Sequence, residues 1–471
     1  MIRTFLKDSA IYVVPIVLSR GTGLILLPVY THFMSSDVYG ALELLMLLYA
    51  LLNLTLPLEI TQAVARFLAD SSDLKEKQRI ASTGYWFTCV VFSIAASVLL
   101  VIPEKISQLL FGGGQYIFEV RLAAIAMLFN ALQYVVQNQL RWLHEARLSA
   151  YVSVIFSMVS AMVSVLALWG WHMGLAGVIY GQIFGSLISL LAGHYLTTRR
   201  VPVRLTFDVV LLRKMLLFSA PLVISNVGVY VATFMDRWLL NHLLGLEAVG
   251  IYSVAMRFAS IVTLGTAVFQ MSLTPLIYSR FKEAETPGEI DRIVSQVLLL
   301  LVPFIGFLAL IAPWLVQLLT GDHYAEAASL VGWLSLVILL MGSYVFFPGL
   351  WISGKTKHIA AINLVAALVN LVLNWILIGQ IGVFGAVLGT LASAITMCGL
   401  YYYYSLKEYH VPYRMWRYLL VLAGLSMFLT LLAVIDSIWL HWIAWLMLCV
   451  AAVLLLPHPR DRLWMNVLYR H

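Results

Sequence analysis

Three arginines stand inside long apolar stretches of this chain, where a fixed positive charge can bind an anion. Arg20 lies near the middle of the first stretch, and Arg237 and Arg257 lie in the outer parts of the seventh and eighth. A charged side chain at the centre of a membrane helix costs about 2.5–3.5 kcal/mol to insert, so such residues usually face the interior of a helix bundle. A guanidinium group donates paired hydrogen bonds to phosphate oxygens. We therefore expect these arginines, and Arg20 above all, to bind an anionic part of a ligand.

Three carboxylates occupy similar stretches and are candidates for coupling the binding of that ligand to an ion. Glu43 and Glu59 lie in the outer and inner parts of the second stretch, and Asp236 precedes Arg237. Asp236 and Arg257 flank the turn Gly245–Glu247 at nearly equal distances along two helices, so we expect them at the same depth. The two residues then form either a purely structural ion pair or a pair that the ligand separates.

Amide side chains repeat at helical spacing and predict polar helix faces. One face comprises Asn130, Gln133, Gln137 and Arg141, and a second comprises Ser219, Asn226, Thr233 and Arg237. Isolated polar residues often only pack helices together. Because these faces end in arginines, we expect them to line water and to bind a polar head group through Asn130, Gln133, Gln137 and Asn226.

Catalytic and metal-binding patterns give no comparable signal. His144-Glu145 lacks the second histidine of a zinc helix, and the sequence contains neither a phosphate-binding P-loop nor a G-x-S-x-G motif. The three cysteines fall inside apolar stretches at unrelated spacings. We therefore expect no enzyme, no metal site and no bound cofactor.

These residues sit in a chain whose composition is that of a membrane protein. Hydrophobic residues make up 62% of the 471 residues, charged residues only 11%, and the mean hydropathy is +0.94. The small net charge of +7 gives no basic track for nucleic acid.

Fourteen stretches are long enough to span a bilayer, at 9–33, 38–67, 81–103, 117–140, 149–171, 173–196, 215–243, 248–280, 293–319, 323–353, 359–378, 381–405, 417–437 and 439–457. The fold class expected is an all-α polytopic membrane protein with about 14 transmembrane helices.

Basic residues set the expected orientation. Lys and Arg gather at the termini and on the even-numbered connections, whereas Lys105 alone lies on an odd-numbered one. Since positive loops stay inside, both termini are expected in the cytoplasm. The first stretch is too long for a signal-peptide core and is expected to be a retained helix.

The sequence also repeats itself. Gly174, Gly177 and Gly181 return as Gly382, Gly385 and Gly389, and three other landmarks recur at offsets of 206 to 210 residues. These landmarks are Pro15–Ser19 with Pro221–Ser225, Tyr39-Gly40 with Val249-Gly250, and Trp142 with Trp351. With about six stretches per half, the halves are expected to be parallel repeats around a central cavity. The glycines are expected chiefly to let helices approach closely.

The repeat divides the chain into four expected parts. They are an N-lobe at 1–200, a cytoplasmic linker at 201–214, a C-lobe at 215–410, and two added helices with a cytoplasmic tail at 411–471. The linker residues 205–212 mix polar and apolar side chains, which favours a segment lying on the inner leaflet.

Several segments resemble the polysaccharide-transporter (Wzx-type O-antigen flippase) branch of the multidrug/oligosaccharidyl-lipid/polysaccharide exporter superfamily. Arg20–Gly40 is similar to that family's first hairpin, Ala63–Ala69 to the end of its second helix, and Gly250–Arg257 to its eighth helix. The resemblance covers the whole chain. It implies a flippase that moves undecaprenyl-diphosphate-linked oligosaccharide to the outer leaflet of a bacterial inner membrane by alternating access, with Arg20 and Arg257 at the family's cavity cations.

The resemblance further implies coupling to a proton or sodium gradient or to the membrane potential. Its expected partners are the lipid-linked oligosaccharide, membrane lipids, a glycan polymerase and a chain-length regulator. Two rival functions stay open. A multidrug or toxin extruder of the same fold would favour an acidic, aromatic cavity, and a membrane-embedded glycan polymerase or ligase would need a larger outer domain than these short connections allow.

Overall fold

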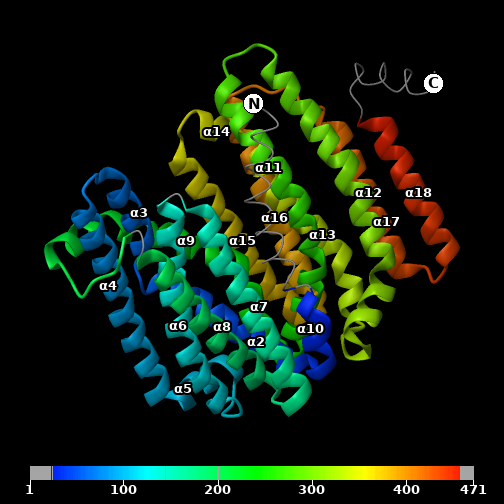
Figure 1. Ribbon diagram of the computed structural model, residues 1–471. Coiled ribbons are helices and arrows are strands. Elements are labelled where there is room, and N and C mark those ends of the chain that lie inside the picture. Colours follow the sequence, from blue (N-terminus) through cyan, green and yellow to red (C-terminus); the bar gives the residue numbers. More distant parts are fainter. Residues whose placement is uncertain (1–22, 24, 144, 199–200, 457–471) are drawn as a thin grey trace, which may run out of the picture. The chain divides into compact units, whose positions relative to one another are not determined.

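The computed structural model describes residues 23, 25–143, 145–198 and 201–456, and every regular element in them is a helix (Figure 1). The chain divides into two compact units, Met1–Gly250 and Ile251–His471, each of which is described by itself. The expected fold class is confirmed, since the protein is an all-α polytopic membrane protein. The four-part division at 200, 214 and 410 stays a prediction.

Within the described residues, twelve helices are long and apolar enough to cross a membrane. They do not include the helix at 209–244, nor the first expected span at 9–33, of which only residues 23 and 25–33 are described. The expected total of about 14 transmembrane helices is compatible with these twelve spans and the additional helix at 209–244.

The helices of the first unit follow the expected spans closely, apart from their breaks. They are α2 (Ser36–Thr55), α3 (Ile60–Asp70), α4 (Leu74–Val101), α5 (Pro103–Phe111), α6 (Ile117–Trp142), α7 (Ala146–Trp171), α8 (Gly174–Thr198) and α9 (Val209–Leu244). Helix α10 (Leu246–Ala259) begins in the first unit and continues into the second.

The second unit contains the remaining elements. They are α11 (Ile261–Arg280), α12 (Thr286–Thr320), η1 (Asp322–Tyr324), α13 (Ala327–Gly342), η2 (Ser343–Phe346), α14 (Gly349–Ile352), α15 (Thr356–Ile381), α16 (Val383–Glu408), α17 (Met415–Val434) and α18 (Ile438–Leu455).

The second expected span, 38–67, is not one helix but two. Helix α2 ends at Thr55 and α3 begins at Ile60, with Leu58 and Glu59 in the left-handed backbone region at φ 48° and 54°. Pro57 explains the interruption, because its ring removes a backbone N–H and clashes with the carbonyl group four residues earlier. The apolar pattern alone predicts one continuous helix at 38–67.

The eighth and tenth expected spans are also interrupted. A turn at Ser260 separates α10 from α11, and the segment before Pro348 breaks the tenth span into α13, η2 and α14. The second and eighth spans are partners in the sequence repeat, so both halves contain a broken helix at this place in the order.

Two connections hold more structure than their sequences suggested. The outer connection after α4 forms α5, which starts at Pro103 and ends at the left-handed Gly112, the usual positions for these two residues. The segment 201–208 is not helical and is anchored on α4, where Arg204 N donates to Ser82 Oγ at 2.8 Å and Arg79 Nε lies 3.3 Å from Asp208 Oδ2. Asp208 also caps α9 by accepting from Leu211 N at 2.8 Å.

The repeat is visible in a reciprocal contact inside the first unit. A Cβ atom at Gly40 would lie 2.0 Å from the carbonyl oxygen of Leu246, and one at Gly250 would lie 1.9 Å from that of Ser36. Adding 210 converts Ser36 and Gly40 into positions 246 and 250, so each contact maps onto the other. Such an exchange is the signature of packing about a two-fold axis.

The two added helices of the second unit are fastened to α12. Asp291 of α12 is 3% exposed, accepts a hydrogen bond from the hydroxyl of Tyr418 in α17, and lies 3.8 Å from Arg414 Nε. Trp445 of α18 donates to the carbonyl of Pro303 at 3.0 Å. These contacts make α17 and α18 part of the second unit.

Candidate functional site

Two of the expected binding residues cannot be placed. Arg20, the expected principal cation, lies outside the described residues, and so does the side chain of Asn226 in α9. Their roles stay predictions from the sequence.

Asp236 and Arg237 are both buried in α9, at 3% and 7% exposure. The backbone N–H of Arg237 donates to Asp236 Oδ1 at 2.8 Å. The side-chain Nη1 atom of Arg237 lies 3.8 Å from the same oxygen. The guanidinium also lies 5.6 Å from the ring centre of Phe234. Burying a carboxylate and a guanidinium side by side limits the cost of removing either charge from water. Asp236 and Arg237 therefore form a buried pair of opposite charges within an apolar helix.

Arg257 lies in α10, half-buried and past the boundary between the units. The expected ion pair between Asp236 and Arg257 therefore joins residues of separately described units. It stays a prediction.

The amide face of α6 is largely inside the first unit. Asn130 and Gln133 are 9% and 4% exposed, whereas Gln137 is half-buried. Gln133 Nε2 donates to Gln137 Oε1 at 3.2 Å, and Ser149 of α7 donates to the Gln137 carbonyl at 3.2 Å. The face thus holds hydrogen-bonded amides, and its contact with a head group stays a prediction.

The two glutamates of the second span have different surroundings. Glu43 is 7% exposed within the continuous part of α2, whereas Glu59 is half-buried in the break before α3. Beside this break lies a cavity of about 240 Å³, lined by Tyr49, Ala50, Asn53, Leu54, Pro57, Glu59, Thr61, Thr88, Ala131, Tyr134 and Val135 from α2, α3, α4 and α6. Its lining combines apolar and polar side chains, and all of them belong to the first unit.

Sequence reasoning overlooked a polar cluster between α15 and α16. Asn374 Nδ2 donates to Asn370 Oδ1 at 3.1 Å, and Asn370 Nδ2 donates to Thr390 Oγ1 at 3.2 Å. All three residues are at most 4% exposed. The available signal was the pair of asparagines four residues apart in an otherwise apolar helix, a spacing that places both on one face.

Potential metal ligands are not gathered in the part of the chain that the structure covers. No group of three His, Cys, Asp or Glu residues is placed there to hold an ion. Cys89, Cys398 and Cys449 are free thiols in this structure.

Comparison of the sequence with known proteins identifies its family. Residues 29–329 match the family described as "Polysaccharide biosynthesis protein". A protein of Shigella flexneri named "Putative O-antigen transporter" is 22% identical over 344 residues, which cover 69% of this chain and 80% of the relative. An uncharacterized membrane protein of Haemophilus influenzae is 20% identical over 380 residues, covering 78% and 89% respectively.

Solved structures show the same fold. The lipid II flippase MurJ in an inward closed conformation superposes with a TM-score of 0.73 at 14% identity, covering 97% of this chain and 99% of MurJ. An inward-facing multidrug resistance MATE transporter gives a TM-score of 0.63 at 15% identity, covering 82% and 94%. The chain therefore belongs to the polysaccharide biosynthesis protein family, in the polysaccharide-transporter branch of the multidrug/oligosaccharidyl-lipid/polysaccharide exporter superfamily, and it is a transporter and not an enzyme.

Proposed function

We propose that this transporter is a flippase for undecaprenyl-diphosphate-linked oligosaccharide, an O-antigen or exopolysaccharide repeat unit. It would move this lipid from the inner to the outer leaflet of a bacterial inner membrane by alternating access. The family match over residues 29–329, with an O-antigen transporter assignment in a relative, is the observation that carries the proposal. The loop charges support an orientation with both termini in the cytoplasm.

The proposed binding roles follow from the chemistry of the substrate. A lipid diphosphate carries negative charge through the membrane, and we assign its binding to Arg20, Arg237 and Arg257. The sugars offer hydroxyl groups, for which the amides of Asn130, Gln133, Gln137 and Asn226 supply both donors and acceptors.

The proposed coupling residues are Asp236, Glu43 and Glu59. A carrier that releases a diphosphate outside must compensate its arginines while it returns empty. Asp236 would pair with Arg257 in the empty carrier, and substrate would displace it, with uptake of a proton or sodium ion or with movement of charge along the membrane potential.

Replacing Arg20 tests the substrate class. Arg20→Ala should abolish surface glycan in a strain that lacks the chromosomal copy, while membrane-inserted protein stays at its normal level. Arg20→Lys should restore export only in part, because an ammonium group cannot form the planar paired contact of a guanidinium. Arg121→Ala is the matched control, since Arg121 is exposed near the start of α6, and it should export normally.

The multidrug extruder of the same fold is the second candidate, favoured by the structural match to a MATE transporter. Drug susceptibility of the same strains separates the two functions. Loss of drug resistance in Arg20→Ala, with surface glycan unchanged, would replace the flippase assignment by the extruder.

Asp236→Asn tests the coupling role. Export should fall, because the empty carrier would lose the carboxylate that is proposed to compensate Arg257. Asp236→Asn combined with Arg257→Gln should be inserted no less well than either single variant, because the double change removes both members of the proposed pair. Export by Asp236→Asn at the unmodified rate would remove this carboxylate from the mechanism.

A further inference from the structure

The cavity beside the α2–α3 break has the size and lining of a carbohydrate site. We propose that it binds one sugar ring of the translocated head group, an inference that rests on the proposed function and names where part of that substrate is held. None of the amides expected from the α6 sequence face lines this cavity; Ala131, Tyr134 and Val135 of α6 do. The site is therefore distinct from the sugar-binding face that the sequence predicts.

The polar groups of the lining match what a sugar presents. Every sugar hydroxyl both donates and accepts hydrogen bonds, so its site must offer both functions. The carboxylate of Glu59 accepts, the amide of Asn53 does both, and the hydroxyl of Thr61 does both. Thr88 donates to the carbonyl of Gly84 at 2.9 Å, which leaves the lone pairs of its oxygen to accept.

Two tyrosine rings complete the lining. Tyr49 of α2 packs against the apolar cluster that includes Phe92 and Met127, and Tyr134 of α6 is 42% exposed. An aromatic ring with a hydroxyl group offers an apolar face and a polar edge. A sugar ring has the complementary pair of surfaces, with C–H groups on its faces and hydroxyl groups around its rim.

The interrupted backbone is a second, independent sign of a binding site. Pro57 has no N–H, so the carbonyl of Asn53 loses its helical partner at the wall of the cavity. Leu58 and Glu59 hold the left-handed conformation, which is rare for residues with side chains and concentrates at functional sites. Irregular backbone at membrane depth is tolerated where it lines a cavity, and transporters place their substrate sites at such breaks.

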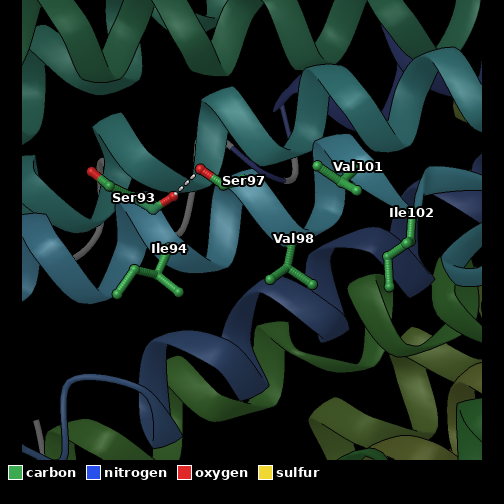
Figure 2. Close-up of a pocket in the computed structure, with 6 residues that line it drawn as sticks. All are labelled: Ser93, Ile94, Ser97, Val98, Val101 and Ile102. Carbon is green, nitrogen blue, oxygen red and sulfur yellow. Dashed lines mark hydrogen bonds between the residues drawn. The ribbon is translucent and has the colours of Figure 1, made fainter.

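Two other hollows in the described structure lack this chemistry. One runs along the end of α4, where Figure 2 shows Ile94, Val98 and Val101 beside two serines. Ser97 donates to the carbonyl of Ser93 at 2.8 Å, so its hydroxyl is satisfied by its own helix. The other follows α9 and is lined by apolar residues with Arg213 alone charged. Such surfaces suit lipid chains.

The volume separates a sugar from a bare cation. A cation is smaller than one water molecule, and a cavity of about 240 Å³ would then be filled mainly by water. A monosaccharide ring with its hydroxyl groups can use polar atoms from α2, α3 and α4 and also the apolar part of the lining. Two tyrosine rings add nothing to a hard cation's oxygen ligands, but they do contact a sugar face.

Saturation-transfer NMR on the full chain in synthetic phospholipid nanodiscs tests the site without a glycoside detergent. The probes are methyl α-glucoside, methyl α-galactoside, rhamnose and N-acetylglucosamine. At least one should receive saturation from the protein, and the signal should fall at least fivefold in Tyr134→Leu and in Asn53→Ala. Tyr151→Leu, which removes an exposed tyrosine of α7 outside the cavity, should leave the signal unchanged.

Each alternative occupant has its own outcome. Displacement of the sugar by sodium chloride but not by choline chloride would overturn the proposal in favour of a cation site. Displacement by inorganic pyrophosphate would overturn it in favour of a diphosphate site. No transfer to any of the four sugars in the unmodified protein, or full transfer in the Tyr134→Leu, Asn53→Ala double variant, would also overturn it.

The two proposals can fail separately. Normal glycan export by Arg20→Ala would refute the proposed role of that arginine and leave the sugar-binding measurement standing. Loss of export by Arg20→Ala together with absent sugar binding would refute only the site at the α2–α3 break.

Discussion

The helix pairs α7–α8 and α15–α16 are related by the sequence repeat and have glycines at matching positions. The atoms that surround these glycines differ between the two pairs. A Cβ atom at Gly181 would lie 2.0 Å from the hydroxyl oxygen of Ser164, and one at Gly389 would lie 2.0 Å from Asn374 Oδ1. Ser164 and Asn374 are separated by 210 residues, the offset of the repeat. In both halves, therefore, Gly181 or its equivalent Gly389 leaves space for a polar atom of the preceding helix.

Both of these polar atoms are buried and have no hydrogen-bond partner within the described part of the chain. In the first half the atom is a single hydroxyl. In the second half it belongs to the Asn370–Asn374–Thr390 cluster. The repeat has preserved the close approach of two helices while the polar chemistry at their interface has diverged.

The surroundings of Gly177 and of its equivalent Gly385 differ still more. A Cβ atom at Gly177 would meet the Cβ of Ala167 at 3.0 Å, whereas one at Gly385 would meet the backbone carbonyl carbon and oxygen of Leu377 at 2.3 Å. Ala167 and Leu377 are again 210 residues apart. Equivalent glycines thus tolerate different amounts of added volume.

The largest effect is expected where the two halves agree, at Gly40 and Gly250. Alanine at either position would place its Cβ within 2.0 Å of a backbone carbonyl oxygen, which cannot rotate away. Each substitution should lower the free energy of unfolding by about 3 kcal/mol, the upper end for overpacked sites. Because the contacts exchange under the repeat, we expect the two losses to agree within about 0.5 kcal/mol, which is the usual scatter of such comparisons.

Equilibrium unfolding in mixed detergent micelles measures both losses. Alanine at Gly113, whose Cβ would meet nothing within 4 Å, is the control and should have no effect from packing. A large loss at one of the two positions and none at the other would show that the reciprocal contact is not shared equally.

The next effect separates Gly385 from Gly177. Gly385→Ala forces α16 away from the backbone of α15 and should cost about 2–3 kcal/mol. Gly177→Ala needs a shift of only a few tenths of an ångström against two side-chain carbons, so we expect a loss below about 1 kcal/mol. Unfolding midpoints of the two variants in one micelle composition measure the difference, and equal losses would contradict the asymmetry between the halves.

Much of this fold follows from the sequence because membrane insertion imposes simple rules. Apolar length locates the spans, and the glycine repeats indicate where helices approach closely; the contacts of Gly181 and Gly389 support that packing role. Apolar length does not reveal breaks such as the one at Leu58-Glu59, since hydropathy is insensitive to backbone direction. Pro57 was the local signal.

The candidate site was less predictable. Periodicity correctly marked the α6 amides as one face, but it did not distinguish a ligand-binding face from a hydrogen-bonded interior one such as Gln133 with Gln137. The cavity at the α2–α3 break depends on residues from four helices, and their proximity is a tertiary property. A spacing rule applied to one helix cannot detect it.

A smaller effect is expected at Gly389, and a second substitution should reduce it. The Cβ of Gly389→Ala would lie 2.0 Å from Asn374 Oδ1 and 3.0 Å from the backbone nitrogen of Asn374. The side chain can move, although its movement breaks the bond to Asn370. We expect a loss of about 1–2 kcal/mol. Asn374→Ala removes the Oδ1 and Cγ atoms that the added Cβ would meet, so it should recover part of the loss.

A double-mutant cycle checks this coupling. Residues in contact usually show interaction energies of about 0.5–3 kcal/mol, so the double variant should be more stable than the sum of the two single losses predicts. Strict additivity would mean that the Asn374 side chain does not limit the approach at Gly389.

The smallest effect concerns the hydroxyl of Ser164, and its expected sign is opposite. Ser164 is fully buried, and its Oγ has no hydrogen-bond partner among the described residues. Removing an unsatisfied buried polar atom eliminates its desolvation cost, and substitution by an apolar group of similar shape is often neutral or stabilising. Helix contacts in membranes show polar contributions of about 0.6 kcal/mol on average. Ser164→Ala should therefore raise the unfolding midpoint slightly, by an amount equivalent to at most about 1 kcal/mol.

Asn374→Ala, the matched change in the other half, should instead lower the unfolding midpoint, because it also removes a donor that satisfies Asn370. Opposite signs at these two positions would show that the halves share a packing geometry but not its polar function, whereas equal signs would show that the asparagine cluster contributes no more than the lone serine.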